Sequence, residues 1–306
     1  MPPHAFFLVS AVFHYLGPAF AVLLFSNVAP LGVAWLRIAS AGAVFALWRR
    51  PCRYFRTLGT IDRRNVAALG IVLACMNSCF YEAIARLPLG TVAGIEFLGP
   101  IALAAFGMRT ARNLAALALA TAGVYILTDV RLVSQPLGYA FAFANCALFI
   151  AYVVLGHRIA SHGGSGGIDR LGAAMLVATF AAVPIGIREA APALLNPVLL
   201  GEGIGVGITS SVIPYVCDQL AMARLTRATF ALLLSLLPAT ASAIGLLVLR
   251  QVPSALEVVG VGLVIAGVAG HCDADRSPGP RCDPHDASAH PFCVIPPCVA
   301  ELSKSL

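Results

Sequence analysis

The feature that most constrains this chain is a series of long apolar segments. Each approaches or exceeds the roughly 20 residues that a helix needs to cross the hydrocarbon core of a bilayer. Hydrocarbon offers an exposed backbone no hydrogen-bond partner, whereas a helix satisfies its own backbone groups. We therefore expect ten transmembrane helices, at about residues 5–28, 30–48, 65–85, 89–108, 113–129, 136–156, 171–188, 203–223, 228–249 and 254–270.

The composition agrees with this prediction and excludes other classes of protein. Of the 306 residues, 59% are hydrophobic and 11% are charged. A soluble domain has about 25% charged residues, and a disordered chain lacks such a density of apolar side chains. A transmembrane barrel would show segments of about ten residues with alternating polarity, and these segments do not alternate. The predicted fold class is all-α, a polytopic membrane protein.

The arginines predict the orientation of the chain. With the N-terminus inside the cell, the inner loops hold 12 arginines and the outer loops hold four. This bias satisfies the positive-inside rule with both termini cytoplasmic, so the net charge of +6 reflects orientation rather than nucleic-acid binding. No lysine or arginine precedes Arg37, which favours a retained first helix over a signal peptide. Arginine in place of lysine and abundant alanine are typical of a GC-rich bacterium, so we expect a bacterial plasma (inner) membrane.

Part of the sequence repeats itself after 138 residues. One ungapped register pairs Arg86 with Arg224, Thr91 with Thr229, Leu98 with Leu236 and Pro100 with Pro238. Five helices in each repeat would make the second copy enter the membrane from the opposite side, which is a signature of secondary transporters. We expect inverted five-helix repeats at residues 1–133 and 134–271. Residues 272–306 are expected to form a disordered cytoplasmic tail.

Residues 85–100, ARLPLGTVAGIEFLGP, resemble the fourth-helix signature of the threonine/homoserine exporter family. Residues 211–218 and 230–238 resemble the corresponding segments of its second half. That family consists of paired EamA domains and lies in the ten-helix branch of the drug/metabolite transporter superfamily. The resemblance implies a proton-coupled secondary exporter of threonine-like or homoserine-like amino acids or related metabolites.

Three positions depart from the family pattern. Leu237 stands where a glutamate often precedes the proline, Arg250-Gln251 replaces a glycine-acid pair, and Asp218 replaces a glutamate. These departures leave open the substrate and the coupling ion. The alternative is a transporter of other cargo on the same scaffold, such as drug-like cations or nucleobases.

Two charged side chains are expected at similar depth in the membrane. Arg37 and Glu96 each lie seven residues into a helix from its outer start, about 10 Å deep at 1.5 Å per residue. An ion pair between them would lower the cost of burying both charges. In one interpretation this pair only holds two helices together. In the other, Glu96 binds a proton or a substrate ammonium group and Arg37 binds a substrate carboxylate.

Prolines indicate local breaks in helical hydrogen bonding. Pro100 has no N–H group, so the carbonyl of Glu96 four residues earlier loses its helical donor. Pro238 is expected to free the carbonyl of Leu234 in the same way, and Pro214 is a third predicted break. A freed carbonyl beside a carboxylate is a reasonable site for an ammonium group.

Further polar residues at membrane depth complete the predicted binding site. Each serves either substrate or proton binding or contacts between helices; they are Asp218, Tyr215, His14, Tyr15, Asn77 and Tyr81. Small residues at four-residue spacing, such as Gly203 and Gly207, predict close helix packing within the fold or across a homodimer.

An enzyme is not expected, because the sequence shows no zinc-protease motif or catalytic triad at membrane depth. The cysteine spacing of the tail does not match structural zinc sites. We therefore expect no metal and no cofactor. The predicted partners are a small-molecule substrate, protons and the lipid bilayer.

Overall fold

The computed structural model describes residues 3–49, 55, 58–107, 111–129, 135–160, 167–222 and 237–272. Within these ranges the chain consists of helices and short turns, without a strand. The predicted tail, from residue 273 onward, lies outside the described residues. An all-helical fold, as predicted from the apolar segments, is therefore confirmed for the part of the chain that the structure describes.

The helices of the first half coincide with the predicted apolar segments. They are α1 (Pro3–Leu24), α2 (Pro30–Arg49), α4 (Thr60–Ile84), α5 (Leu89–Gly107) and α6 (Ala111–Asp129). Proline opens α1 and α2 because its missing N–H group would be unpaired in a first helical turn anyway. Pro100 lies within α5 and does not end that helix.

The helices of the second half agree with the prediction in the same way. They are α7 (Pro136–Ala160), α8 (Gly167–Leu195), α9 (Pro197–Gly207), η1 (Ile208–Val212), α10 (Ile213–Met222), α12 (Leu237–Leu249) and α13 (Ala255–Cys272). The segment predicted at 203–223 is continuous through α9, η1 and α10, with one π-helical turn in the middle. Asn196 caps α9, since its side chain accepts a hydrogen bond from the N–H of Val198 at 2.9 Å.

Five of the described helices are long and apolar enough to cross a membrane. They are Pro30–Trp48, Thr60–Ile84, Pro136–Leu155, Asp169–Leu195 and Pro197–Cys217. Large apolar side chains also cover the outside of the bundle, where Leu47 and Leu195 are 86% and 87% exposed. A soluble monomer rarely exposes so much apolar surface, whereas lipid tails would cover it.

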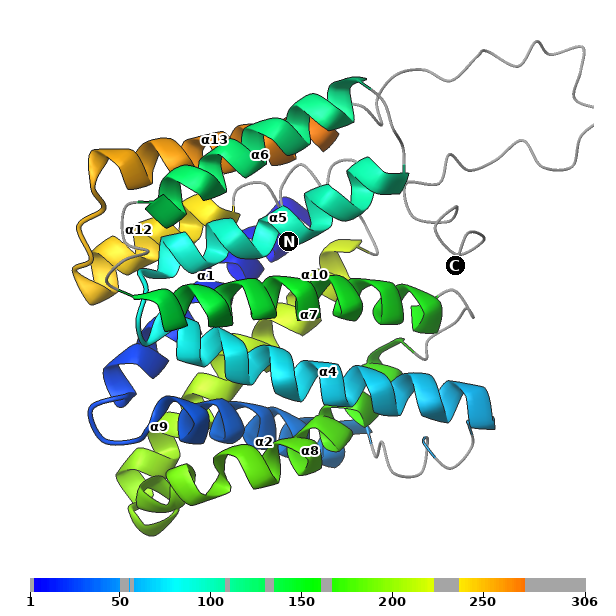
Figure 1. Ribbon diagram of the computed structural model, residues 1–306. Helices are drawn as coiled ribbons and strands as arrows, with labels where there is room; N and C mark the ends of the chain where they lie inside the picture. Colours follow the sequence, from blue (N-terminus) through cyan, green and yellow to red (C-terminus); the bar gives the residue numbers. More distant parts are fainter. Residues whose placement is uncertain are drawn as a thin grey trace, which may run out of the picture.

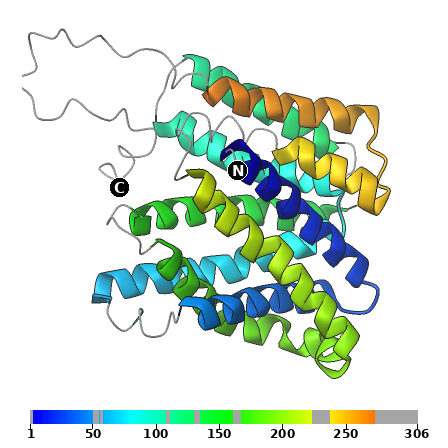
Figure 2. The same ribbon diagram turned by 180° about the vertical axis from the view of Figure 1, so that it is seen from behind.

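Figure 1 shows the helices lying side by side as one bundle. The turns that join α1 to α2, α4 to α5, α8 to α9 and α12 to α13 lie together at its left end. The pair α6 and α13 packs along one edge, and the pair α2 and α8 packs along the opposite edge. Between these edges α4 contacts α7 and α8, while α5 contacts α6, α7 and α12. Figure 2 shows the bundle from the other side, where α10 crosses in front of the other helices beside α1.

Glycines allow close approach where α2 crosses α8 and α9. A Cβ atom added at Gly32 would lie 2.5 Å from the carbonyl carbon of Glu189. A Cβ atom at Gly207 would lie 1.7 Å from Oγ of Ser40, and one at Gly203 would lie 2.9 Å from Cδ1 of Leu36. The Gly203 and Gly207 seam therefore serves packing within the fold rather than contact between two copies.

We expect Gly32→Ala to destabilise the protein by about 1–3 kcal/mol, because the new methyl group would clash with the backbone of α8. The matched control is Gly205→Ala, since a Cβ atom there meets nothing within 4 Å. Thermal unfolding of both purified variants in the same detergent measures the difference. Equal midpoints for the two variants would contradict the observed crossing of α2 and α8.

Arg250, in the turn between α12 and α13, has a φ of 54°. This left-handed conformation favours glycine, and it occurs at the position where the family pattern has glycine. We expect Arg250→Gly to raise the free energy of unfolding by up to about 1 kcal/mol, because relief of strain exceeds the extra chain entropy. Arg250→Ala should bring no such gain because alanine keeps the strained backbone. Denaturation of the two variants side by side measures this difference.

Candidate functional site

Arg37 of α2 is held by the π-helical turn η1. The Arg37 side chain is 6% exposed. Its Nε donates a hydrogen bond to Oγ of Ser211 at 3.0 Å, and its Nη2 donates one to the carbonyl oxygen of Ser210 at 3.1 Å. The N–H of Ile213 bonds the carbonyl of Ile208, five residues back. Such π turns frequently mark functional sites, and this one presents a carbonyl and a hydroxyl to a buried cation.

Tyr81 of α4 covers the same guanidinium group. The Cζ atom of Arg37 lies 5.6 Å from the centre of the Tyr81 ring, within the range of a cation–π interaction. The Tyr81 hydroxyl lies beside Ser210 and Arg37. The cation is thus enclosed by α2, α4 and η1, elements from both halves of the chain.

Glu96 of α5 is the buried anion of the site and is 6% exposed. Its Oε1 accepts a hydrogen bond from Nδ2 of Asn145 on α7 at 3.3 Å. Asn145 itself is fully buried. Since Pro100 has no N–H group, the carbonyl of Glu96 also lacks its helical donor. The anion therefore lies beside polar groups from the backbone of α5 and from α7.

Arg37 and Glu96 do not form the ion pair that their equal depth permits. Arg37 bonds η1 and Glu96 bonds α7. Equal depth along two helices does not decide which way their side chains face. Here α2 packs on α8, α9 and η1, while α5 packs on α6, α7 and α12. The two charges still interact electrostatically across the site.

Tyr15 and His14 of α1 border the same region. Tyr15 is fully buried and interacts electrostatically with Glu96, as His14 does with Arg37. The rings of His14 and Tyr15 meet edge to face with centroids 5.2 Å apart. A small residue, Gly17, allows α1 to approach, because a Cβ atom there would lie 2.0 Å from Oγ of Ser210.

Several buried polar atoms of this cluster have no well-aligned hydrogen-bond partner among the residues that the structure describes. They are the hydroxyl oxygens of Tyr15, Tyr81 and Ser210 and Oδ1 of Asn145. Leaving such a group unpaired costs about 1–3 kcal/mol, and native proteins pair nearly all of them. The cluster therefore has donors and acceptors available for a polar ligand between Arg37 and Glu96.

Other predicted residues lie outside this cluster or are only partly described. Asn77 donates to the carbonyl of Leu73 within its own helix at 2.8 Å. The carbonyl of Pro214 accepts a hydrogen bond from Ser10 of α1 at 3.3 Å, so Pro214 joins α10 to α1. Tyr215 packs against an apolar core that includes Phe45 and Met175.

Three of the predicted features rest on positions that the structure describes only in part or not at all. Asp218 lies in α10, but its side chain is outside the described residues. Pro238 is buried at the start of the described part of α12. The carbonyl of Leu234 that it was expected to free is outside the described residues.

Sequence reasoning did not place Ser210 or Ser211 in the site, and it left Asn145 open between a contact between helices and a substrate contact. The serines follow Thr209 in an otherwise apolar stretch between Gly207 and Pro214. This short run of hydroxyl residues at membrane depth was the available signal. Asn145 lies in an apolar stretch of α7, and only its hydrogen bond to Glu96 distinguishes it from an asparagine that serves packing.

Known proteins resemble this chain in sequence and in fold. The model of the EamA-like transporter family matches residues 136–271. The threonine/homoserine exporter RhtA of Escherichia coli (strain K12) is 30% identical over 258 residues, which cover 83% of this chain and 85% of that protein. The same figures hold for the threonine/homoserine exporter RhtA of Salmonella typhimurium (strain SL1344).

A crystal structure of a protein that is 18% identical superimposes with a TM-score of 0.53 and covers 89% of this chain and 99% of that chain. At this level of identity the likeness concerns the fold alone. The matches cover most of this chain and most of each relative, and five described helices are long and apolar enough to cross a membrane. This chain is thus a membrane protein that belongs to the EamA-like transporter family.

Proposed function

We propose that this protein is a proton-coupled secondary exporter of small amino acids of the threonine and homoserine class. The observation that carries the proposal is the buried cluster in which Arg37 and Glu96 lie apart, each with protein partners of its own. The relatives in Escherichia coli and Salmonella are named as exporters of these amino acids. A zwitterion needs one cationic and one anionic contact, and this cluster offers both.

The site would bind the two ends of an amino acid separately. Arg37 has five N–H donors and spends two of them on Ser211 and Ser210, so the others are available to a substrate carboxylate. Glu96 would accept the ammonium group, assisted by the hydroxyl of Tyr15 and Oδ1 of Asn145. A substrate bound in this way would bridge α2 and α5, two helices that pack on different neighbours.

Proton coupling follows from competition for Glu96. On the outer side, where protons are more abundant, protonation of the carboxylate would remove the negative charge that holds the ammonium group, and the substrate would leave. On the inner side, loss of that proton would restore the anion and allow a new substrate to bind. One proton would then enter for each amino acid that leaves.

The proposal includes ten membrane helices in two inverted repeats, at 1–133 and 134–271, with both termini cytoplasmic in a bacterial inner membrane. The packing pattern supports it. A shift of 138 residues relates α1 to α7, α2 to α8, α4 to α9–α10, α5 to α12 and α6 to α13. If each helix is replaced by its equivalent in the other half, the contacts of α4 and α5 with α7 become contacts of α10 and α12 with α1. Both sets of contacts are observed. The pairs α2–α8 and α6–α13 each join a helix to its own equivalent.

Efflux from proteoliposomes tests the proposed function. Purified protein is reconstituted, vesicles are loaded with radiolabelled threonine or homoserine, and efflux is followed with and without an imposed pH gradient. We expect faster efflux when the outside is acidic, and no acceleration in vesicles without protein. An equal efflux rate with and without the pH gradient would refute proton coupling. Absence of efflux for both amino acids would refute the substrate class.

A further inference from the structure

Two hydroxyl groups of the central cluster have no part in the zwitterion binding proposed above. They belong to Tyr81 of α4 and Ser210 of η1, and both side chains are fully buried. The Tyr81 hydroxyl lies beside Ser210 and the guanidinium group of Arg37. Neither hydroxyl oxygen has a well-aligned hydrogen-bond partner among the described residues. The cluster thus holds a pair of hydroxyl groups next to its cation.

Packing fixes the positions of both hydroxyl groups. The carbonyl oxygen of Ser210 accepts a hydrogen bond from Arg37 at 3.1 Å, and a Cβ atom added at Gly17 of α1 would lie 2.8 Å from the Cα atom of Ser210. The centre of the Tyr81 ring lies 5.6 Å from Cζ of Arg37, and the same ring meets that of Phe25 edge to face. Groups that are already ordered lose little conformational entropy when a ligand binds.

The chemistry of a hydroxyl pair favours a third hydroxyl group as its partner. A hydroxyl group donates one hydrogen bond and accepts two, so a ligand hydroxyl can donate to one member of the pair and accept from the other. A substrate carboxylate has the guanidinium of Arg37 instead, which carries N–H donors beyond the two that bond η1. A substrate ammonium group has Glu96. In threonine and homoserine, the polar group that is left is the side-chain hydroxyl.

We propose that Tyr81 and Ser210 form a subsite for the side-chain hydroxyl of the substrate, and that this subsite selects hydroxylated amino acids over apolar ones of the same shape. This inference rests on the function proposed above. The hydroxyl of threonine is on the carbon next to the one that bears the carboxylate, so it lies close to groups around that carboxylate. A substrate without it would leave two buried hydroxyl groups unpaired. Sites built to hydrogen-bond a substrate hydroxyl reject analogues that lack it for this reason.

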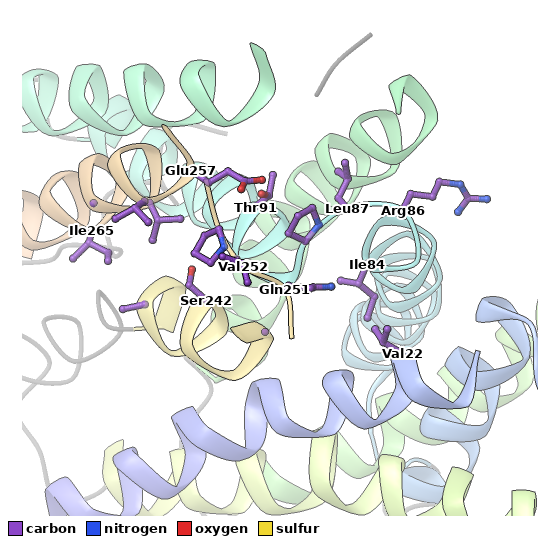
Figure 3. A pocket seen from close by; sticks show the side chains of 18 of the residues that line it. Val22, Ile84, Arg86, Leu87, Thr91, Ser242, Gln251, Val252, Glu257 and Ile265 are labelled. Atoms are coloured by element: carbon purple, nitrogen blue, oxygen red, sulfur yellow. The ribbon is translucent and has the colours of Figure 1, made fainter. Parts of the chain in front are cut away.

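The structure also contains a cavity at the end of the bundle, in a different place. Its volume is about 600 Å³, and Figure 3 shows it between α5, α12 and α13, with Val22 of α1 at its edge. Neither Tyr81 nor Ser210 lines it. An amino acid bound there would meet the hydroxyl groups of Thr91 and Ser242 instead. Variants in each of the two places therefore distinguish the two locations.

Calorimetric titration of the purified full-length protein in detergent tests the subsite through binding alone. Threonine is compared with valine, in which a methyl group replaces the hydroxyl, and homoserine with norvaline, which differs in the same way. We expect each hydroxylated amino acid to bind at least about tenfold more tightly than its isostere, because two hydrogen bonds are made or lost.

This titration separates the subsite from the export function. Equal affinity for threonine and valine would overturn the subsite, and so would absence of threonine binding, whatever the efflux assay shows. Selective binding of threonine by a protein that exports neither amino acid would refute the proposed export and leave the subsite standing.

Two variants remove the hydroxyl groups one at a time. Tyr81→Phe keeps the ring over Arg37, and Ser210→Ala keeps the carbonyl that Arg37 bonds. We expect each to reduce the preference for threonine over valine to about threefold or less, through weaker threonine binding. An unchanged preference in Ser210→Ala would overturn the proposal even if Tyr81→Phe failed to fold. If Tyr81→Phe weakened threonine and valine equally, its hydroxyl would bind the carboxylate and the subsite would be refuted.

Three control variants complete the experiment. Tyr125→Phe removes an exposed hydroxyl on α6 and should leave every affinity unchanged. Tyr15→Phe removes the hydroxyl proposed to assist the ammonium group, so it should weaken threonine and valine by the same factor. Gly262→Leu adds a side chain to the wall of the cavity, where an added Cβ atom meets nothing within 4 Å, and should keep the preference for threonine. Loss of threonine binding in Gly262→Leu would place the amino acid in the cavity and refute the subsite.

Discussion

Replacing Glu96 by glutamine is expected to abolish export driven by a proton gradient. Glutamine has nearly the same shape, and its Oε1 can still accept the hydrogen bond from Asn145, so the helices should pack as before. It cannot bind a proton in this pH range or carry the charge that holds an ammonium group. A charged hydrogen bond is worth about 1.5–3 kcal/mol, which corresponds to substrate binding about 10- to 100-fold weaker. Efflux of labelled threonine with and without an imposed pH gradient measures both losses.

The control for Glu96→Gln is Glu202→Gln, which removes an exposed carboxylate on α9. We expect this control to export normally and to respond fully to the gradient. Thermal unfolding in detergent should show that both variants fold. If Glu96→Gln retained gradient-driven efflux, the proton would have to bind elsewhere and the coupling mechanism proposed for Glu96 would be wrong.

The second large effect is expected from Arg37→Lys. Lysine keeps the positive charge, but its compact ammonium group cannot reach two acceptors in the planar geometry of a guanidinium. Here those acceptors are Oγ of Ser211 and the carbonyl oxygen of Ser210. We expect an increase in KM of about tenfold or more, because the cation would no longer be held where a substrate carboxylate can reach it. Initial efflux rates over a range of internal threonine concentrations separate KM from the maximal rate.

Two further variants show whether the effect of Arg37→Lys is specific to this position. Arg64→Lys changes an exposed arginine on α4 and should export normally. Ser211→Ala removes one of the two bonds but leaves the guanidinium, so we expect a smaller loss, about 1 kcal/mol of stability and a modest rise in KM. An unchanged KM for Arg37→Lys would mean that Arg37 only joins α2 to η1.

The helices of this fold were predictable because membrane crossing depends on local properties of the sequence. Apolar length located each segment, and prolines such as Pro30 and Pro136 stand at observed helix starts. That Arg37 and Glu96 serve one binding site stays a prediction. The direct contact that their equal depth permits is not formed, because sequence position gives depth along a helix but not the neighbour that a side chain faces.

By itself, then, the sequence determined that this chain is a bundle of apolar helices with buried charges on α2 and α5. Only the tertiary structure decided that Arg37 bonds Ser210 and Ser211, residues more than 170 positions away, and that Glu96 bonds Asn145. The physical reason is that helix formation and membrane burial depend on contiguous residues. The partners of a buried polar group instead depend on how distant helices rotate and cross, here through close approaches at small residues such as Gly17 and Gly207.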